Sequence, residues 1–379
     1  MDFAPSSSHE MIRKMVHEFA VRELRPDCLK WDEEQTYPDW WVPKLGELGL
    51  LGVFVPEKYS GAGLDAVSYA IAIEELSWGD ASIGVLAAVN NGLACDPILR
   101  WGTEEQKQAY LPKLASGEWL GAYALTEPGS GSDAAAMRTT AALEGDEWVL
   151  NGTKAFVTNA LHAKLLVVYA RTGSEKYDIS AFLVPKPTKG LTDLKKENKM
   201  GIRASDTMTL GLDDCRIPKE NLLGPRGKGF NVALATLDGG RIGIASQSIG
   251  IAQAAYDEAV KFAKDRVAFG KPIAELQAIQ FKLADMAMEI HAARLLTYRA
   301  AWMKDQGVRH TQESSVAKLF ASEAAHRAVN EAVQIHGGYG FIKEYLVEKL
   351  YRDQRVTEIY EGTSEVQRLV IARSVLGGK

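Results

Sequence analysis

The sequence has few of the residues that build disulfide frameworks or metal centres. Its three cysteines, Cys28, Cys95 and Cys215, lie far apart, form no CxxC pair and have no histidines at metal-ligand spacing. We therefore expect structural thiols and no metal site.

The sequence also lacks an excess of positive charge. The net charge is −5, so a polyanionic ligand must be met by a local basic cluster, and nucleic acid is not an expected partner.

Signals for export or membrane insertion are missing as well. The first ten residues, MDFAPSSSHE, contain neither a basic n-region nor an apolar h-region. We expect no apolar run to reach the roughly 20 residues that span a bilayer, and hence no membrane association. The expected location is the cytoplasm of a bacterium, or the mitochondrial matrix if a transit peptide has been removed.

The hydrophobic patterning of the first third of the chain is helical. With 379 residues, of which 46% are hydrophobic and 25% charged, the chain is long enough for two or three globular domains. A capping box at Thr103-Glu-Glu-Gln106 predicts the start of a helix before Pro112. We predict an α-helical N-terminal domain over residues 1–118, with further helices in 8–25, 67–76 and 83–99.

Short β-branched and aromatic runs replace the helical pattern in residues 119–226, which we predict to be a compact, β-barrel-like domain. The pair Asn151-Gly152 between two of these runs predicts a hairpin turn. The runs cover residues 148–150, 156–158, 165–170, 179–184 and 207–212.

Helical spacing returns in residues 227–379, where long apolar helices with short links predict an antiparallel bundle. The fold class is thus α+β and multidomain, in the order α, β, α. The expected helices cover residues 230–264, 273–306, 311–336 and 364–376.

A glycine-rich loop at residues 123–133 is the most distinctive segment. Gly129 and Gly131 let the backbone approach a ligand closely, while Thr126 and Ser132 supply hydroxyl groups. These features suit a planar heterocycle or a phosphate, and an ordinary turn explains them equally well.

Three further segments are ambiguous in the same way. Phe156 and Thr158 on a strand would suit one face of a flat cofactor, or a core aromatic beside an edge threonine. Arg266 and Lys271, at a break between long helices, would suit a diphosphate or a solvated loop. Asp238-Gly-Gly-Arg241 would suit a polar headgroup or close helix packing.

Two segments near the C-terminus complete the set. Three glycines follow His336, which we expect to be a satisfied structural histidine. In the stretch RVTEIYEGTSEVQ, Glu361 stands between Tyr360 and a helix-breaking glycine, and Ser364–Gln367 is typical of a capping box whose free N–H groups could hold an anion. Taken alone, Glu361 is more simply a solvated charge at a helix end.

Together and in this order, these segments resemble the flavin-dependent acyl-CoA dehydrogenases over essentially the whole chain, most closely the short-chain (butyryl-CoA) branch. The resemblance implies a helical domain, a β domain and a C-terminal four-helix bundle, with FAD between them and usually across a subunit contact in a homotetramer. The segments that carry it are Leu125–Asp133, Gly201–Ser205, Asp214–Pro218, Leu237–Ala245 and Ile359–Glu365.

The same resemblance implies roles for individual residues. The implied contacts to the flavin ring are Tyr123, Leu125, Thr126, Gly131, Ser132, Phe156, Val157 and Thr158. Those to the rest of FAD, some from a neighbouring subunit, are Arg266, Phe269, Gln277, Gln334, Gly337, Gly338, Thr363, Ser364 and Glu365. Those to acyl-CoA are Ser132, Asp238, Arg241 and Gly362.

Two departures from the family pattern leave the reacting groups in place. Phe156 stands where many members have tryptophan, and Ser130 where many have alanine. In isovaleryl-type members the base precedes the conserved arginine, and that position is Gly240 here. Glu361 is therefore the only base in either location.

The implied reaction is α,β-dehydrogenation of an acyl-CoA thioester to the trans-2-enoyl-CoA, a step of fatty acid β-oxidation. Glu361 would take the α-proton and flavin N5 the hydride, while the backbone N–H of Glu361 and a ribityl hydroxyl bind the thioester oxygen. An acyl chain that displaces water should raise the pKa of Glu361 toward neutrality. Electron-transfer flavoprotein is the implied electron acceptor.

Other functions remain open at this point. An acyl-CoA oxidase would use the same fold and react directly with oxygen, and a branched-chain acyl-CoA dehydrogenase would differ in its substrate alone. Outside enzymes, a non-catalytic binding relative, including one that associates with DNA, predicts a missing base or an added basic C-terminal domain. The presence of Glu361 and the acidic balance disfavour this alternative.

Overall fold

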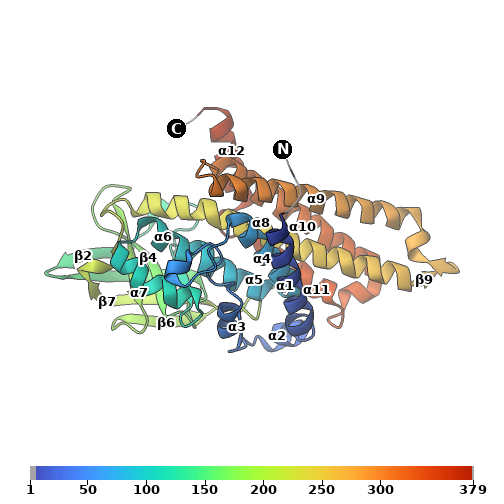
Figure 1. Cartoon of the computed structure of the whole chain (residues 1–379), viewed down its shortest axis with the longest axis horizontal. Helices are drawn as coiled ribbons and strands as arrows, with labels where there is room; N and C mark the ends of the chain where they lie inside the picture. The colour runs from blue at the N-terminus through green and yellow to red at the C-terminus, as the bar shows by residue number, and fades with distance from the viewer. Residues whose placement is uncertain (1–5, 378–379) are drawn as a thin grey trace.

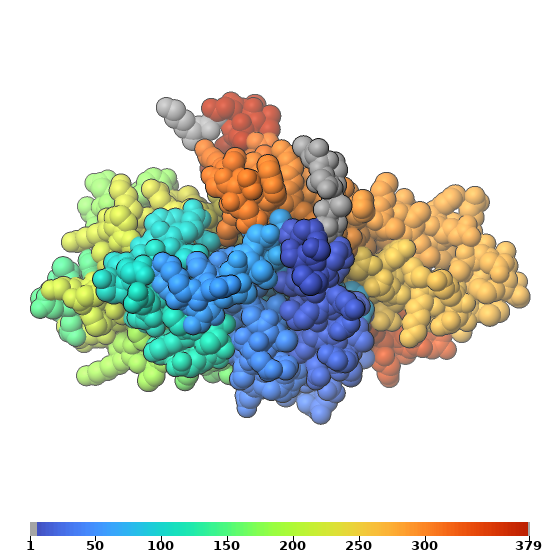
Figure 2. Space-filling view, viewed as in Figure 1, coloured from blue at the N-terminus to red at the C-terminus, as the bar shows by residue number. Residues whose placement is uncertain are grey.

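The computed structural model describes residues 6–377 and shows an elongated molecule with a sheet at one end and long helices at the other (Figure 1). Figure 2 shows the N-terminal helices, in blue, at the centre of one face, between the green sheet region and the orange C-terminal helices. The chain therefore runs through three parts in the order α, β, α, as predicted.

Helices make up the first part. The Thr103–Gln106 capping box is confirmed, because the Thr103 side chain accepts the Gln106 N–H and the Gln106 side chain accepts that of Thr103. Pro112 lies inside this helix. The proline lies in the last turn, where the lost N–H costs one hydrogen bond, and buried Leu111 and Leu114 keep that turn packed. The helices are α1 (Ser7–Phe19), α2 (Cys28–Glu34), α3 (Trp41–Glu47), α4 (Ala66–Gly79), α5 (Ala81–Val89), α6 (Asp96–Trp101) and α7 (Glu104–Ala115), with π-helical turns at Ala20–Leu24 and Asn90–Cys95.

One expectation about apolar runs is wrong. The continuous helical stretch Ala81–Trp101 is long and apolar enough to cross a membrane by length and composition. Within the described residues it is the one such stretch, and 94% of its apolar window is buried inside the fold. The stretch is buried as a core helix is, and a core helix can meet the same criteria of length and composition as a membrane-spanning helix.

The second part is a mixed eight-stranded sheet. Its order is β6-β7-β3-β2-β4-β5-β8, with β1 pairing in parallel with β4. β4 and β5 are buried along almost their whole length, so they form the centre of this part. The strands are β1 (Gly121–Ala124), β2 (Thr140–Glu144), β3 (Glu147–Thr158), β4 (Leu165–Arg171), β5 (Ile179–Pro185), β6 (Leu191–Lys196), β7 (Thr207–Pro218) and β8 (Leu222–Leu223).

The predicted hairpin at Asn151-Gly152 is wrong, because both residues lie inside β3. The pairing of β3 with β7 shifts register between Leu150 and Gly152, which marks a β-bulge. A Cβ on Gly152 would overlap Thr139, and the Asn151 side chain accepts the Asp214 N–H at 2.8 Å. The glycine thus allows a close backbone approach within the sheet rather than a turn.

The third part is the predicted bundle. Helices α8 (Gly229–Asp265), α9 (Gln277–Asp305) and α10 (Thr311–His336) pack on one another, and α11 (Leu346–Gln354) packs against α8 and α10. The sequence reasoning missed α11, since its short apolar pattern is interrupted by charged residues, two of which, Lys349 and Asp353, are buried as an ion pair at 2.6 Å. A small hairpin, β9 (Val267–Ala268) and β10 (Lys271–Pro272), joins α8 to α9.

The last helix, α12 (Ser364–Val375), begins one residue earlier than the capping box predicts. Thr363 is its N-cap, because its side chain accepts the Val366 N–H at 3.3 Å, and Ser364 is already the first helical residue.

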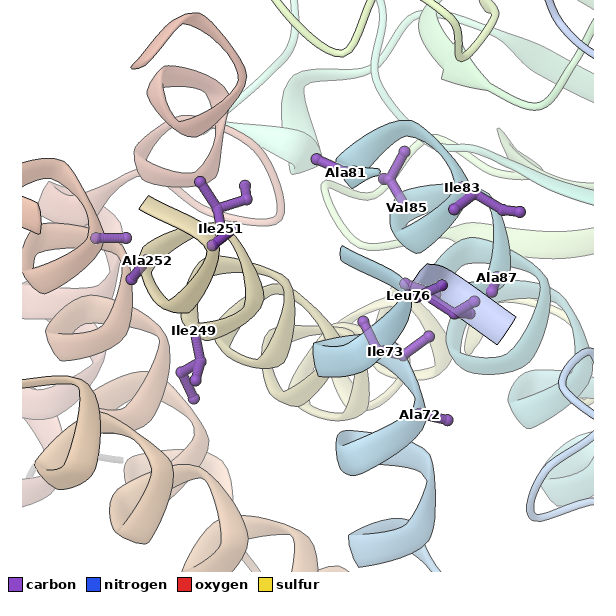
Figure 3. Close-up of a cluster of buried hydrophobic side chains, with 14 of the residues drawn as sticks. Ala72, Ile73, Leu76, Ala81, Ile83, Val85, Ala87, Ile249, Ile251 and Ala252 are labelled. Atoms are coloured by element: carbon purple, nitrogen blue, oxygen red, sulfur yellow. The ribbon is translucent and has the colours of Figure 1, made fainter. Parts of the chain in front are cut away.

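A shared hydrophobic core joins the N-terminal helices to the bundle. Figure 3 shows Ile73 of α4 and Val85 of α5 on one side and Ile249 of α8 on the other, all buried in one cluster. The bundle and the N-terminal helices therefore form one body.

Candidate active site

Glu361 lies in the short segment between the 3₁₀ turn Arg355–Glu358 and α12. Its φ is +51° and that of Gly362 is +95°, so both residues are in the left-handed region, which is uncommon for a glutamate. Glu361 as a residue is half-buried, but its Oε2 is out of contact with solvent and has no hydrogen-bond partner. A buried polar atom without a partner is a place where a ligand can bind.

The electrostatic surroundings of Glu361 favour a proton acceptor near neutral pH. Burial raises the pKa of Glu361 to about 7, and the cations of Lys318 and Arg241 oppose this shift. The fold alone therefore moves this pKa toward neutrality, and the further effect expected of a bound acyl chain stays a prediction. The Glu361 Oε2 is buried away from solvent, so the interpretation of Glu361 as a solvated helix-end charge is wrong.

Arg241, which is buried, and Asp238, which is half-buried, lie one turn apart on α8. The guanidinium contacts the Asp238 carboxylate at 2.6 Å and donates to the Ser315 hydroxyl at 3.2 Å, while its Nε has no partner. Thr311 donates to the second oxygen of Asp238 at 2.7 Å. Burial lowers the pKa of Arg241, and the neighbouring carboxylates oppose the shift.

The glycine-rich loop and β3 are brought together, as expected. The Ala155 N–H donates to the Thr126 carbonyl at 2.9 Å, and Lys154 donates to the Leu125 carbonyl at 3.1 Å. Gly129 and Gly131 face open space, where an added Cβ would meet nothing within 4 Å. Ser130 donates to the Asp133 carbonyl at 2.8 Å, which closes the loop on itself. The loop's backbone is thereby fixed while its glycines stay accessible.

A buried ion pair beneath this loop escaped the sequence reasoning. Lys154 contacts the Glu127 carboxylate at 2.9 Å, and that carboxylate also accepts the N–H groups of Arg138 and Thr139. Burial lowers the pKa of Lys154 to about 8. The sequence gives no clear signal for it, because Lys154 stands between Thr153 and Ala155 in β3 and looks like a lysine on the solvent face of a strand.

Two aromatic side chains stand exposed on strained backbone. Phe156, at φ +55°, is 66% exposed beside a second irregularity of β3, so the alternative that it is a core residue is wrong. Phe269, at φ +53° in the β9–β10 hairpin, is 91% exposed. Val157 is buried in the sheet, so only its backbone is free to face a ligand. Exposed aromatics on such backbone favour a binding role over packing.

The remaining predicted residues gather elsewhere. The Arg266 guanidinium lies 5.5 Å from the centre of the Tyr339 ring, and Gly337 and Gly338, at the end of α10, face open space. His336 donates from Nδ1 to the Ala332 carbonyl at 2.8 Å and is a satisfied structural histidine, as expected. The hairpin with Phe269 is at the far end of the bundle from the sheet (Figure 1). One chain therefore does not bring this group to the glycine-rich loop.

These residues fit a flat cofactor with a phosphate-bearing tail. The accessible glycines and Phe156 suit a planar ring, and Arg266 with Gln277 and Gln334 offers polar groups for a tail. The start of α12 adds a buried Ser364 hydroxyl without a partner, which fits a polar ligand. The three cysteines are free and buried, as expected of structural thiols. Residues 6–377 contain no group of three or more histidine, cysteine and carboxylate side chains placed to hold a metal.

A three-part fold of this kind, with a buried unpartnered carboxylate, defines a class of flavin-dependent enzymes. Profiles described as acyl-CoA dehydrogenase N-terminal, middle and C-terminal domains match residues 6–118, 122–215 and 227–376. The chain belongs to the acyl-CoA dehydrogenase family and is an oxidoreductase.

Curated relatives and solved structures agree with this assignment. The chain is 56% identical over 371 residues to the mitochondrial short-chain specific acyl-CoA dehydrogenase of Rattus norvegicus, covering 97% of this chain and 90% of the relative. It is 46% identical over 377 residues to the short-chain specific acyl-CoA dehydrogenase of Clostridium acetobutylicum, covering 99% and 100%.

Among solved structures, butyryl-CoA dehydrogenase from Megasphaera elsdenii matches with a TM-score of 0.98 and 44% identity, covering 99% of this chain and 100% of that one. A chain in a structure described as an electron transferring flavoprotein of Acidaminococcus fermentans matches with a TM-score of 0.98 and 45% identity, with the same coverage. An acyl-CoA dehydrogenase complexed with FAD from Bacillus anthracis has a TM-score of 0.93 and 40% identity, covering 98% of this chain and 67% of that one.

Proposed function

We propose that this protein dehydrogenates short-chain acyl-CoA thioesters to trans-2-enoyl-CoA, with FAD as cofactor and Glu361 as the catalytic base. The membership in the family and the short-chain relatives support the reaction and the cofactor. The observation that carries the role of Glu361 is its buried, unpartnered Oε2 on a carboxyl group whose pKa is about 7.

Glu361 is suited to remove the proton next to the thioester carbonyl. A base with a pKa near the working pH combines a large ionised fraction with a strong drive to accept a proton. Its Oε2 needs no protein donor to be displaced before it meets the substrate. FAD, when bound, supplies the acceptor for the hydride from the neighbouring carbon.

The substrate contacts follow from the surroundings of Glu361. We propose that Ser132, Asp238, Arg241 and Gly362 bind acyl-CoA. Arg241 donates from Nη1 to Asp238 and Ser315, whereas its buried Nε has no partner, so it can donate to one more ligand. Ser132 is exposed on the glycine-rich loop.

FAD is held by two groups of residues in this proposal. The flavin ring is held by Tyr123, Leu125, Thr126, Gly131, Ser132 and Phe156–Thr158. A further contact to FAD comes from Thr363–Glu365, at the start of α12. The second group holds the tail of an FAD whose ring lies in another copy of the chain, and it consists of Arg266, Phe269, Gln277, Gln334, Gly337 and Gly338. We place the boundaries of the three domains after residues 118 and 226, where helices give way to the sheet and return.

A second copy of the chain is needed for such a site, and α9 offers a surface for it. Phe281, Met288, Leu295 and Trp302 are between 40% and 64% exposed and recur every seven residues along α9. An exposed apolar stripe at this spacing is typical of helix pairing. We therefore propose a homo-oligomer, with the homotetramer of the family as the expected form.

Reduced flavin must pass its electrons to a partner, and we propose electron-transfer flavoprotein. The match to a chain in a structure of such a flavoprotein supports this. The proposed setting is fatty acid β-oxidation, in the cytoplasm of a bacterium or in the mitochondrial matrix, since the relatives include a mitochondrial enzyme of Rattus norvegicus and an enzyme of Clostridium acetobutylicum.

The proposed function is tested with the purified protein. It should be yellow and bind one FAD per chain, and anaerobic butyryl-CoA should bleach the flavin and yield crotonyl-CoA. Turnover with an artificial acceptor should exceed turnover with dioxygen, whereas substantial peroxide release would favour an oxidase. A colourless protein that takes up no FAD would contradict the proposal.

A further inference from the structure

Lys318 of α10 is a buried lysine that the proposed reaction does not yet use. Its side chain has no exposed surface, and within residues 6–377 it forms no ion pair. Its one hydrogen bond is to the carbonyl of Gly362, at 2.8 Å. A buried cation without a paired carboxylate is costly, so its position calls for a reason other than packing.

The carbonyl that Lys318 contacts belongs to the strained segment. Glu361 and Gly362 are both at positive φ, a backbone state that a glutamate rarely adopts without support. Gln367 supplies the second support, because its side-chain amide donates to the Gly362 carbonyl at 2.9 Å and to that of Glu361 at 3.2 Å. Two buried donors, one charged and one neutral, thus hold the base's backbone from two sides.

The electrostatic role of Lys318 differs from that of Arg241. Five titratable groups face Glu361: Lys318 from α10, Arg241 from α8, Tyr69 from α4, Tyr123 from β1, and Tyr360 from its own segment. The Asp238 carboxylate at 2.6 Å offsets the charge of Arg241.

Within the described residues, Lys318 has no carboxylate as close to it as Asp238 is to Arg241. Glu361, Glu358 and Glu365 all interact with it electrostatically, but none pairs with it. Lys318 therefore supplies a positive charge that no single partner cancels. Burial lowers its own pKa to about 8, so it is still largely protonated at neutral pH.

We propose that Lys318 is a positioning residue for proton abstraction, which fixes the backbone of Glu361 through Gly362 and favours the carboxylate form of the base. The proposal rests on the proposed role of Glu361. Gln367 shares the fixing of the backbone but brings no charge. Loss of Lys318 should therefore affect both geometry and protonation, and loss of Gln367 geometry alone.

The sign of the charge effect follows from the arrangement. A nearby cation stabilises the ionised carboxylate, so removing it raises the pKa of Glu361. A smaller fraction of the base is then ionised at neutral pH. The acidic limb of the pH profile for flavin reduction should move to higher pH.

The test compares Lys318→Met with Gln367→Met in the FAD-loaded enzyme, since both changes leave an unbranched neutral side chain. Two readouts are needed: the pH dependence of flavin reduction by butyryl-CoA, and an infrared titration of the protonated carboxyl band that Glu361→Gln removes. Both variants should reduce flavin at least about tenfold more slowly, as expected for a base held in a poorer geometry. Lys318→Met alone should shift both titrations upward by roughly one pH unit. Lys318→Arg should keep the wild-type titration.

The contrary outcomes are distinct. Unshifted titrations in Lys318→Met would overturn the proposal, and so would a variant that loses FAD and the folded state, because Lys318 would then serve the fold. A Glu361→Gln enzyme with wild-type flavin reduction would instead overturn the role of Glu361 itself. That result is independent of how the Lys318 variants behave.

Discussion

The Glu361 carboxylate and Gly240 of α8 occupy adjoining space, because a Cβ placed on Gly240 would overlap Oε2 of Glu361. The same Cβ would lie 3.0 Å from a methyl group of Leu93. A glycine at position 240 leaves room for the carboxylate from position 361, whereas a larger residue would require the Glu361 side chain to move. Members of the family are expected to carry the base either at the position of Gly240 or at that of Glu361. These two positions are therefore alternatives in space as well as in sequence.

Gly240→Ala should displace the carboxylate and lower turnover by about 10²-fold, the cost of a base misplaced by about an ångström. FAD content should be unchanged. Gly239→Ala is the matched control, because its Cβ would meet only the flexible end of Lys304, at 3.0 Å. Steady-state kinetics of both variants check this, and equal turnover in the two would mean that the carboxylate does not need this space.

The pKa of Glu361 predicts two opposite pH dependences. Flavin reduction needs the ionised base, so its rate should fall as pH drops through about 7. Stability behaves differently. In the folded state Glu361 keeps its proton up to about pH 7, whereas in the unfolded chain the same carboxyl group loses its proton near its ordinary pKa of 4.5. The Glu361 contribution to the free energy of unfolding therefore falls as pH rises from about 4.5 to about 7. Denaturant unfolding of wild type and Glu361→Gln should thus converge at low pH and diverge toward neutral pH.

The ion pair beneath the glycine-rich loop should govern FAD affinity. Lys154→Met leaves the Glu127 carboxylate buried and unpaired, which should lower the free energy of unfolding by about 3–5 kcal/mol. It also frees the Leu125 carbonyl, so FAD should dissociate more readily. Lys219→Met breaks the exposed Lys219–Asp146 pair of the same part of the fold and should change neither property noticeably. FAD titration of the apoproteins checks the prediction, and equal affinities would contradict it.

The apolar stripe on α9 should hold copies of the chain together. Leu295→Glu should lower the molar mass in light scattering and weaken FAD binding, because the tail-binding residues then lie on a separated chain. Met11→Glu, at an apolar residue of α1 that is 66% exposed, is the control and should change neither. A wild-type protein that is monomeric and holds FAD would refute this arrangement.

Sequence patterns predicted most of the fold, and the family resemblance singled out Glu361, whose role as the base stays a proposal. The long helices and buried strands follow from periodicity, because one face or both faces must be buried. The errors arose where tertiary contacts override local signals. Gly152 serves a close approach to Thr139 instead of a turn, and the charged residues Lys349 and Asp353 of α11 are paired in the interior.

The supporting residues of the site could not be predicted in the same way. Lys318 and Gln367 lie in helices, where a lysine or glutamine normally faces solvent, and only the folded structure reveals that both point at the Gly362 carbonyl. The positive φ of Glu361 is likewise fixed by its neighbours and not by its own residue type. Glu361 was predictable because it precedes a glycine at a helix break and because the segment resembles that of a known family.

Anaerobic mixing of Glu361→Gln with butyryl-CoA tests the central claim most directly. The change keeps the shape of the side chain and leaves Arg241, Thr363 and the α12 cap in place, so FAD and substrate should still bind. If Glu361 is the base, flavin bleaching should slow by about 10² to 10⁴-fold, with the loss in kcat more than in KM. Bleaching at the wild-type rate would show that another residue takes the proton and would contradict the account.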